Sequence, residues 1–457
     1  MSGERHSEAP EAGPVAGFLA GDGRGRIPGS LPVISWREED EHAFLDDLER
    51  CADSTIELSR RGVWHGHWAE LSPAAVGLDL RAELSDHAAL HLCWNDARPI
   101  VLPGILDDAI HRAPDEIAEA FELYGELGED GGLKRWLKRA LPAAGPEWRV
   151  RDRRADLFDA ERDVEKVFVS RETAGRELRD LWWKSGRLST FEGDDSLRLR
   201  ISFGLERDDD ASREPARQRA VATLAEAVLP GASFVPEEPS LNRMLEILAG
   251  EELFLTQHIA YWNAPEGGAL FHHDAFDEPT EGGQRGVLYA QLAGRTAWLA
   301  LSVEDLALRV SEFVELLREG ELEWVTEDLF PRSADLDGAV ECARDRERLV
   351  RELALPGCGR FAGLVNRGPE FTDFLANAGH AAILEAGDVI LLPNYGLART
   401  VMHSVFCADD EPTYAISAAL RQARPDVRTD LQAALSRGRG KRKSNGNQSR
   451  RSTRRRD

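Results

Sequence analysis

The stretch Gly268–Phe276, GALFHHDAF, places two histidines and an aspartate at the end of an apolar run. Residues separated by one position in an extended strand lie on the same face. His272 and Asp274 therefore converge, whereas His273 points to the opposite face. An imidazole and a carboxylate on one face are two of the three ligands of a 2-His-1-carboxylate facial triad, which leaves positions open on Fe(II). Another strand must supply the second histidine.

Two histidines follow this stretch in the chain, His380 and His403. His403 lies in MHSVFC, after a Gly-Asp turn and a strand-like run and before a last strand-like run. This position predicts that His403 completes a metal site with His272 and Asp274. The alternative interpretation is that the adjacent histidines are surface residues and that the aspartate caps a turn.

The order of β-rich and helical patterns predicts an α+β protein. After an alternating run at 196–206, strand-like runs with turn residues between them follow to about residue 422. A helical block at 303–378 interrupts them and begins with a Ser302–Asp305 cap. An antiparallel β-barrel with a helical insertion fits this order, and we predict a barrel domain over 196–428.

The regions outside that domain have different compositions. Residues 1–32 are rich in Gly, Pro, Glu and Ala and are expected to be disordered. Residues 33–195 have a mostly helical pattern, and AGRELRDLWWKSGRL at 174–188 is among the clearest predicted helices. Residues 429–457 are predicted to form a basic, disordered tail.

Several motifs in order resemble one family. APEGGALFHHDAFDE, QLAGRTAWLAL, EAGDVILLPN, MHSVFC and YAISAAL are similar to the motifs of JmjC-type, cupin-fold Fe(II)/2-oxoglutarate oxygenases, in particular the bacterial ribosomal-oxygenase-like branch. The resemblance covers roughly residues 250–422 and implies a double-stranded β-helix (cupin, jelly-roll) fold. It implies that His272, Asp274 and His403 bind Fe(II), and that 2-oxoglutarate and O₂ occupy the open positions. The implied activity is a dioxygenase reaction that hydroxylates a substrate and releases succinate and CO₂.

The chain departs from the family pattern at the cosubstrate. The family commonly binds the distal carboxylate of 2-oxoglutarate with a lysine at the position of Thr296. A buried carboxylate still requires a cation. Arg421 on the last strand, assisted by Ser417, is the first substitute, and Arg295 and Arg399 are the others. The loop between Pro393 and His403 is also longer than in the family.

Charge and composition limit the partners. The formal net charge is −24, yet Arg437–Asp457 carries ten Lys/Arg and one Asp, so the remaining chain is near −33. Such a body repels nucleic acid. The tail either contacts phosphates, as in a weak nucleic-acid or ribosome contact, or is a solvated end. The chain has no run of 18 apolar residues and no pattern typical of a secretion signal, so we expect a cytoplasmic protein that does not enter membranes.

Two functions remain open on the sequence. The first is hydroxylation of a protein side chain, of a basic partner for example, or of a small molecule. The second is a non-catalytic cupin-like binding protein that acts through its helical region and basic tail, an alternative kept open by Thr296. The loop 277–286 is a candidate substrate lid, and Tyr289 and Trp298 are candidate pocket walls. Five other histidines are weaker candidates for ligands: His65, His67, His87, His91 and His258. The spacing of His87 and His91 on a predicted helix can bind metal, but packed or solvated roles are favoured for the first four. His258 lies on a strand leading to the site, where it either lines the pocket or, as favoured, packs in the core.

Overall fold

The computed structural model describes the chain from Trp94 to Gln422 with internal gaps. The described residues are 94–151, 165–173, 176–188, 194–203, 215–249, 253–265, 267–275, 284–320, 326, 329–353, 360–367, 371, 374–375, 378, 380–396 and 398–422. The predictions for 1–32, for the four histidines at 65, 67, 87 and 91 and for the basic tail lie outside this part of the chain, as does most of the predicted lid loop.

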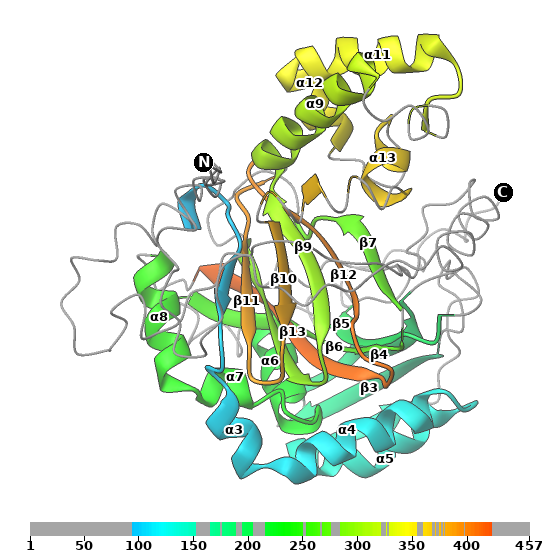
Figure 1. Cartoon of the computed structure of the whole chain (residues 1–457). Coiled ribbons are helices and arrows are strands. Elements are labelled where there is room, and N and C mark those ends of the chain that lie inside the picture. The colour runs from blue at the N-terminus through cyan, green and yellow to red at the C-terminus, as the bar shows by residue number, and fades with distance from the viewer. Residues whose placement is uncertain are drawn as a thin grey trace, which may run out of the picture.

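Two antiparallel sheets form the centre of the molecule (Figure 1). The larger sheet has nine strands in the order β1-β11-β8-β13-β6-β5-β4-β3-β2, and the smaller has four in the order β10-β9-β12-β7. The strands of the larger sheet are β1 (Ile100–Leu102), β2 (Trp148–Arg151), β3 (Glu165–Thr173), β4 (Arg176–Arg187), β5 (Leu197–Phe203), β6 (Leu253–Asn263), β8 (Gln284–Ala293), β11 (Val389–Pro393) and β13 (Thr413–Gln422). Those of the smaller are β7 (Gly268–His272), β9 (Thr296–Ser302), β10 (Ala381–Leu384) and β12 (Val401–Cys407).

Helices cover one face of the larger sheet and extend from one end of the smaller sheet (Figure 1). The covering helices are α3 (Asp107–Arg112), α4 (Pro114–Leu127), α5 (Gly132–Ala144), α6 (Pro215–Val228), α7 (Phe234–Glu237) and α8 (Pro239–Ala249). The helices between β9 and β10 are α9 (Val303–Glu319), α11 (Ser333–Arg344), α12 (Arg346–Leu353) and α13 (Ala362–Arg367). The fold class is therefore α+β with large antiparallel sheets, as predicted.

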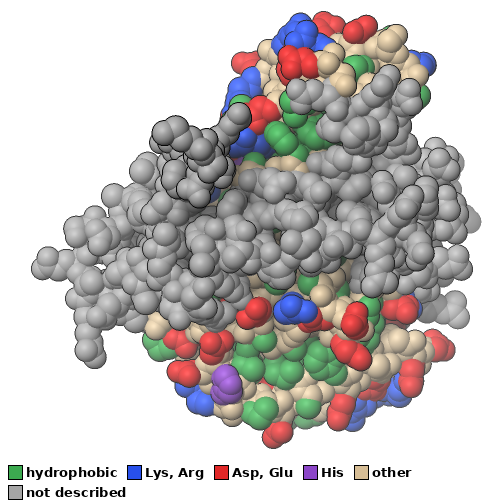
Figure 2. Space-filling model, viewed as in Figure 1, with side chains coloured by type: hydrophobic (Ala, Val, Ile, Leu, Met, Phe, Trp, Pro, Cys, Tyr) green, Lys and Arg blue, Asp and Glu red, His purple; other side chains and the backbone are tan. Residues whose placement is uncertain are grey.

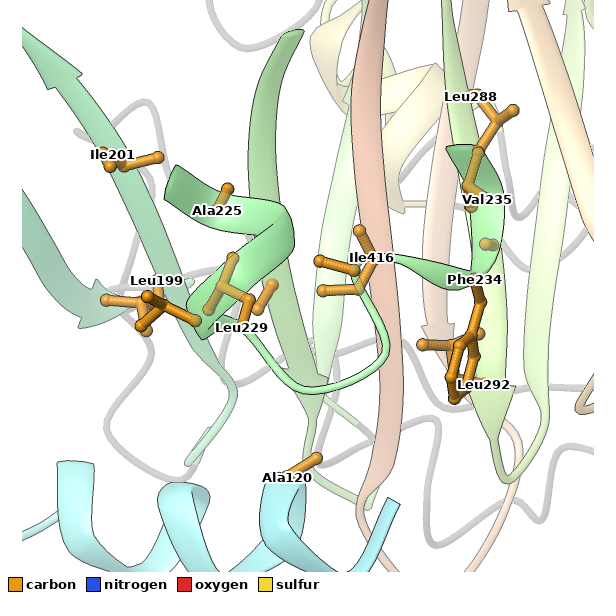
Figure 3. Close-up of a cluster of buried hydrophobic side chains, with 14 of the residues drawn as sticks. Ala120, Leu199, Ile201, Ala225, Leu229, Phe234, Val235, Leu288, Leu292 and Ile416 are labelled. Atoms are coloured by element: carbon orange, nitrogen blue, oxygen red, sulfur yellow. The ribbon is translucent and has the colours of Figure 1, made fainter. Parts of the chain in front are cut away.

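Three apolar clusters hold these layers together. The largest packs the covering helices on the outer face of the nine-stranded sheet. Figure 3 shows part of it, with Ala120 of helix α4, Leu229 directly after helix α6, and Leu199 and Ile416 from strands. A second lies between the two sheets and includes Trp298. The third joins the helices of the insertion to the smaller sheet. Because the inner faces of both sheets contribute to the second cluster, side chains at the sheet ends can converge on one site.

The helical insertion begins where the sequence predicts it. Ser302 caps α9, and its hydroxyl accepts a hydrogen bond from the Asp305 backbone N–H at 2.9 Å. The predicted apolar face of this helix is buried; it consists of Leu306, Val310, Phe313, Val314 and Leu317. Burial of this face explains why a helix of this length forms between two strands.

The prediction of a mostly helical region before residue 196 is wrong in its second half. The segment 174–188 is predicted as a helix, but its residues Arg176–Arg187 form strand β4, and β2 and β3 precede it. Trp182 and Trp183 are both almost fully buried, on opposite faces of the strand, because the sheet is covered on both sides there. Two-sided burial removes the alternation that would have indicated a strand, and the charged residues around the tryptophans imitate a helical pattern.

The two sheets are not hydrogen-bonded to each other along their edges, so they do not form a closed barrel in the described part of the chain. No described helix is long and apolar enough to cross a membrane. Figure 2 shows acidic side chains on the helical insertion at the top and on the helices at the bottom of the view.

Candidate metal centre

Two neighbouring strands of the smaller sheet bring the predicted triad together. His272 at the end of β7 lies directly opposite His403 of β12, and their ring centroids are 4.2 Å apart. Asp274 follows β7, and its Oδ2 lies 3.6 Å from Nε2 of His403. One possible ligand atom from each of the three side chains lies within 4.8 Å of the other two. The structure thus assembles His272, Asp274 and His403 into one cluster.

Backbone packing positions these side chains. An ideal Cβ at Gly268 would lie 2.1 Å from the Val405 carbonyl oxygen, so glycine is required where β7 approaches β12. The Nδ1 of His272 lies 2.7 Å from the Leu270 carbonyl oxygen, which accepts a hydrogen bond from a protonated Nδ1. This hydrogen bond leaves Nε2 with its lone pair available to a metal.

The cluster fits a divalent metal. Two donor atoms bound to one ion at about 2.1 Å lie roughly 3 Å apart when adjacent and about 4.2 Å apart when opposite. The 3.6 Å between Asp274 Oδ2 and His403 Nε2 lies midway between these two values, so both atoms are within reach of one ion after a side-chain shift of about 0.6 Å. Burial, and then the neighbouring His272, lower the pKa of His403 to about 3. The His403 imidazole is therefore neutral at physiological pH, as a metal ligand must be.

Two aromatic side chains shield His403 from solvent. The Trp298 ring stacks on the His403 imidazole with centroids 5.6 Å apart, and Tyr289 packs edge-on against Trp298 at 4.7 Å. Burial raises the pKa of Tyr289, so its phenol stays protonated. Both residues pack behind His403, and neither of them lines the cavity beside the site.

A cavity of about 410 Å³ opens beside Asp274 on the inner face of the larger sheet. This volume falls in the range that holds small-molecule ligands. Its walls come from strands β4, β5, β6, β8 and β13 and from the residues after β7: Trp182, Arg200, Ile201, Ser202, Gln257, Ile259, Tyr261, His273, Asp274, Ala275, Gln284, Val287, Ser417 and Ala419.

The residues predicted to bind the cosubstrate lie in different parts of the structure. Ser417 lines the cavity. Thr296 is fully buried, and its hydroxyl donates to Gln291 Oε1 at 2.8 Å and accepts from Trp298 Nε1 at 2.9 Å. Arg421 is buried on β13, with an Nη 3.5 Å from Gln257 Oε1, but does not line the cavity.

The other two arginines lie away from the cavity lining. Arg295 pairs with Asp409 at 2.6 Å and is half exposed. His403 is opposite Ala300 on β9, and Arg295 directly precedes that strand, five residues or about 16 Å from Ala300. Arg399 is exposed and donates to the Asn95 carbonyl oxygen.

Three further described histidines that bear on the predictions lie outside the cluster. His273, predicted to point away, accepts a hydrogen bond from the Ala275 N–H at 3.2 Å and lines the cavity. His380, the other candidate for the third ligand, accepts from Arg309 at 3.2 Å. His258 is fully buried, with Nε2 3.9 Å from Glu226 of helix α6. It therefore packs on the helical side of the sheet, as expected for a core histidine.

Several residues near the site were missed by sequence reasoning. Gln284 Nε2 donates to the Asp274 carbonyl oxygen at 3.3 Å, and Asn366 Oδ1 accepts from the Phe271 N–H at 3.0 Å. Arg200 and Trp182 line the cavity from strands before the predicted barrel motifs. The alternation of arginine with apolar residues in LRLRISF was the available signal for Arg200, because it places charged side chains on one face of β5.

Comparison with known proteins finds solved structures that match at low identity and low TM-score. No family model matches the chain, and no curated protein sequence matches it. A structure of YcfD, a ribosomal oxygenase from Escherichia coli, is 12% identical, with a TM-score of 0.20, covering 69% of this chain and 52% of that one. A crystal structure of the same ribosomal oxygenase is 11% identical, with a TM-score of 0.20, covering 64% and 53%.

A third structure of E. coli YcfD is 12% identical, with a TM-score of 0.21, covering 70% of this chain and 62% of that one. The chain thus spans between half and two thirds of the length of the YcfD chains that it matches. TM-scores of 0.20 and 0.21 are too low to transfer geometry, so the chemistry below is inferred from the triad and the cavity.

Proposed function

We propose that the chain is an Fe(II)- and 2-oxoglutarate-dependent dioxygenase that hydroxylates its substrate. The observation that carries this proposal is the convergence of His272, Asp274 and His403 beside a cavity. Two imidazoles and one carboxylate on one side of an ion form the ligand set of non-haem Fe(II) oxygenases, and they leave the opposite side open. When bound, Fe(II) and 2-oxoglutarate would supply oxygen activation for hydroxylation.

The strand arrangement supports a double-stranded β-helix fold. From β6 onwards, β6, β8, β11 and β13 lie in the larger sheet, whereas β7, β9, β10 and β12 lie in the smaller one. Two facing four-stranded sets, fed by strands that cross between the sheets, are the arrangement of a jelly roll. It brings the end of β7 next to β12, which is what a triad with ligands from distant sequence positions requires.

The residues of this chain have distinct tasks in the proposed reaction. His272, Asp274 and His403 hold the ion, and the Leu270 carbonyl sets the tautomer of His272. Trp298 and Tyr289 exclude water from behind His403. The cavity beside Asp274 takes the ligands, and the substrate is either a protein side chain or a small molecule. No separate general base is needed for this reaction.

A non-catalytic binding protein is the second candidate function. Thr296 lies at the position of the expected lysine, and both of its hydroxyl hydrogen bonds are used within the protein. Thr296 therefore cannot bind a carboxylate in the way that the expected lysine would. If no other residue supplies the cation, the cavity binds no 2-oxoglutarate.

Anaerobic titration of the purified chain with Fe(II) and then with 2-oxoglutarate tests the proposal. We expect one equivalent of each to bind, and succinate release after oxygen is admitted. His403→Ala is the matched control, because it removes one ligand and should abolish both iron binding and succinate release. Iron binding without any 2-oxoglutarate binding would instead favour the non-catalytic function.

A further inference from the structure

Trp298 reaches His403 across two neighbouring strands of the smaller sheet. His403 of β12 lies directly opposite Ala300 of β9, and Trp298 is two residues away on the same face of β9. Diagonal neighbours of this kind lie about 7–8 Å apart, a distance that an aromatic side chain spans. The indole plane is tilted by 24° from the imidazole plane, with ring centroids 5.6 Å apart. The orientation of the Trp298 ring therefore bears directly on the position of a metal ligand.

A chain of hydrogen bonds fixes the polar edge of this indole ring. Trp298 Nε1 donates to Thr296 Oγ1 at 2.9 Å, and the Thr296 hydroxyl donates to Gln291 Oε1 at 2.8 Å. Thr296 lies two residues before Trp298 on β9 and therefore on the same face. All three side chains belong to residues that are at most 1% exposed, so water does not compete for these hydrogen bonds.

The direction of each hydrogen bond in this chain is determined at the glutamine end. Gln291 Nε2 donates to the carbonyl oxygens of Ala293, at 2.7 Å, and of Tyr414, at 3.4 Å. Carbonyl oxygens only accept, so the amide nitrogen must face them and Oε1 must face Thr296. The Thr296 hydroxyl must then donate to Oε1, which leaves its lone pairs for the indole N–H. Because an indole N–H only donates, every donor in the chain meets an acceptor.

We propose that Thr296 and Gln291 are positioning residues for the metal centre, an assignment that rests on the proposed function. They hold the Trp298 ring against His403, and the ring in turn keeps the imidazole directed towards the metal position. Without the Thr296 hydroxyl the buried indole N–H has no partner in this chain, which is costly enough to favour a different ring position. Thr296, which stands where the family commonly has a lysine, thus has a task of its own beside the metal centre.

Co(II) titration of the full chain, followed by absorption of the bound ion, tests this assignment without any turnover. Thr296→Val keeps the shape of the side chain but removes the hydroxyl. It should lower the Co(II) affinity about 10-fold, the lower end of the usual effect of residues that orient metal ligands. Thr296→Ser retains the hydroxyl and should bind Co(II) within about 2-fold of the wild type, the spread expected of an uncoupled change.

Thr413→Val is the matched control. Thr413 is also fully buried, and its hydroxyl has no hydrogen-bond partner among the described residues, so this substitution removes a buried hydroxyl that lies outside the chain. It should leave the Co(II) affinity within about 2-fold of the wild type. Urea unfolding of each variant separates the two effects, because a purely structural threonine would change stability and leave the Co(II) affinity of the folded protein unchanged.

A second variant tests the chain from its other end. Gln291→Met removes the acceptor for the Thr296 hydroxyl and keeps the test usable if Thr296→Val does not fold. It should lower the Co(II) affinity by no more than Thr296→Val does, because the threonine can still accept from the indole. The double variant should lose no more affinity than Thr296→Val alone, since residues that act through one another are not additive.

Each contrary outcome has a definite meaning. An unchanged Co(II) affinity in Thr296→Val, or equal losses in Thr296→Val and Thr296→Ser, would overturn the assignment. An equal loss in Thr413→Val would also overturn it, since that result would show a general effect of substitution in the core. Losses that multiply in the double variant would show two independent effects and contradict a single chain. If the wild-type protein binds no Co(II), the proposed function itself is wrong, and the roles of Thr296 and Gln291 fail with it.

Discussion

The exposure of the three triad residues differs in a way that matters for metal binding. The His403 side chain is 4% exposed, whereas the Asp274 side chain is 38% exposed. The buried histidine is thus held rigidly between Trp298 and His272, and the carboxylate closes the site from the cavity side. His403 is therefore fixed in place by its packing, whereas the more exposed Asp274 carboxylate is free to adjust to a metal ion that enters from the cavity.

Removal of either histidine ligand should therefore abolish tight metal binding. We expect His272→Ala and His403→Ala to lower the affinity for Co(II) by more than about 100-fold, which exceeds the usual effect of changing an outer-shell residue. His273→Ala is the matched control, since its ring accepts from Ala275 instead of facing the cluster, and it should change the affinity little. Titration followed by Co(II) absorption measures all three, and equal losses in the His272 and His273 variants would contradict the assignment.

At the scale of single elements, strand β7 is the least supported part of the site. It is an edge strand of the smaller sheet, where it pairs only with β12. The N–H of Phe271 donates to Asn366 Oδ1 of helix α13, at 3.0 Å. The helical insertion thereby holds the backbone immediately before His272, and this contact makes the insertion part of the metal site.

Loss of this contact should loosen the metal site. Asn366→Leu keeps the approximate size but removes the acceptor, and we expect Co(II) affinity to fall about 10-fold, as for other residues that orient metal ligands. Asn366→Asp retains an acceptor oxygen and should restore most of the affinity. Side-by-side Co(II) titrations measure the effect. The same loss in both variants would show that packing of α13, and not this hydrogen bond, is what matters.

At the scale of the whole molecule, buried histidines couple stability to pH. Burial lowers the pKa of His258 to about 4, below its ordinary value near 6.5. The nearby Glu226 has its pKa raised, mainly by burial, so the two groups do not stabilise each other's charges. Above pH 6.5 His258 is neutral in both the folded and unfolded chains. Below that pH only the unfolded chain gains the proton, so stability declines until the folded pKa is reached.

The free energy of unfolding should therefore fall by about 2 kcal/mol between pH 7.5 and pH 5 through His258 alone, at about 1.4 kcal/mol per pH unit below the unfolded pKa. His258→Leu should remove this part of the decline, because leucine does not titrate. Urea unfolding at the two pH values measures the difference. A variant that declines as steeply as the wild type would show that other groups dominate, among them His380, whose pKa is also lowered to about 4.

Much of the fold and the site follows from local sequence patterns. The i, i+2 spacing of His272 and Asp274 at a strand end predicts that they share a face, and the structure agrees. The Ser302 cap and the apolar periodicity after it predict helix α9 correctly. These features depend on neighbours in the chain, so the amino-acid order alone determines them. The roles of the 277–286 loop and of the basic tail stay predictions, since both lie largely outside the described residues.

Tertiary structure decided the rest. The sequence wrongly predicts a helix at strand β4 because Trp182 and Trp183 are buried on opposite faces of the strand, a property that depends on what packs against each face of the sheet. The arginines predicted to bind the cosubstrate carboxylate do not line the cavity, and Arg295 pairs with Asp409 instead. Arg200 and Asn366 reach the site from distant segments. A contact between residues far apart in the chain depends on which surfaces meet when the chain folds. Local sequence patterns therefore do not predict it.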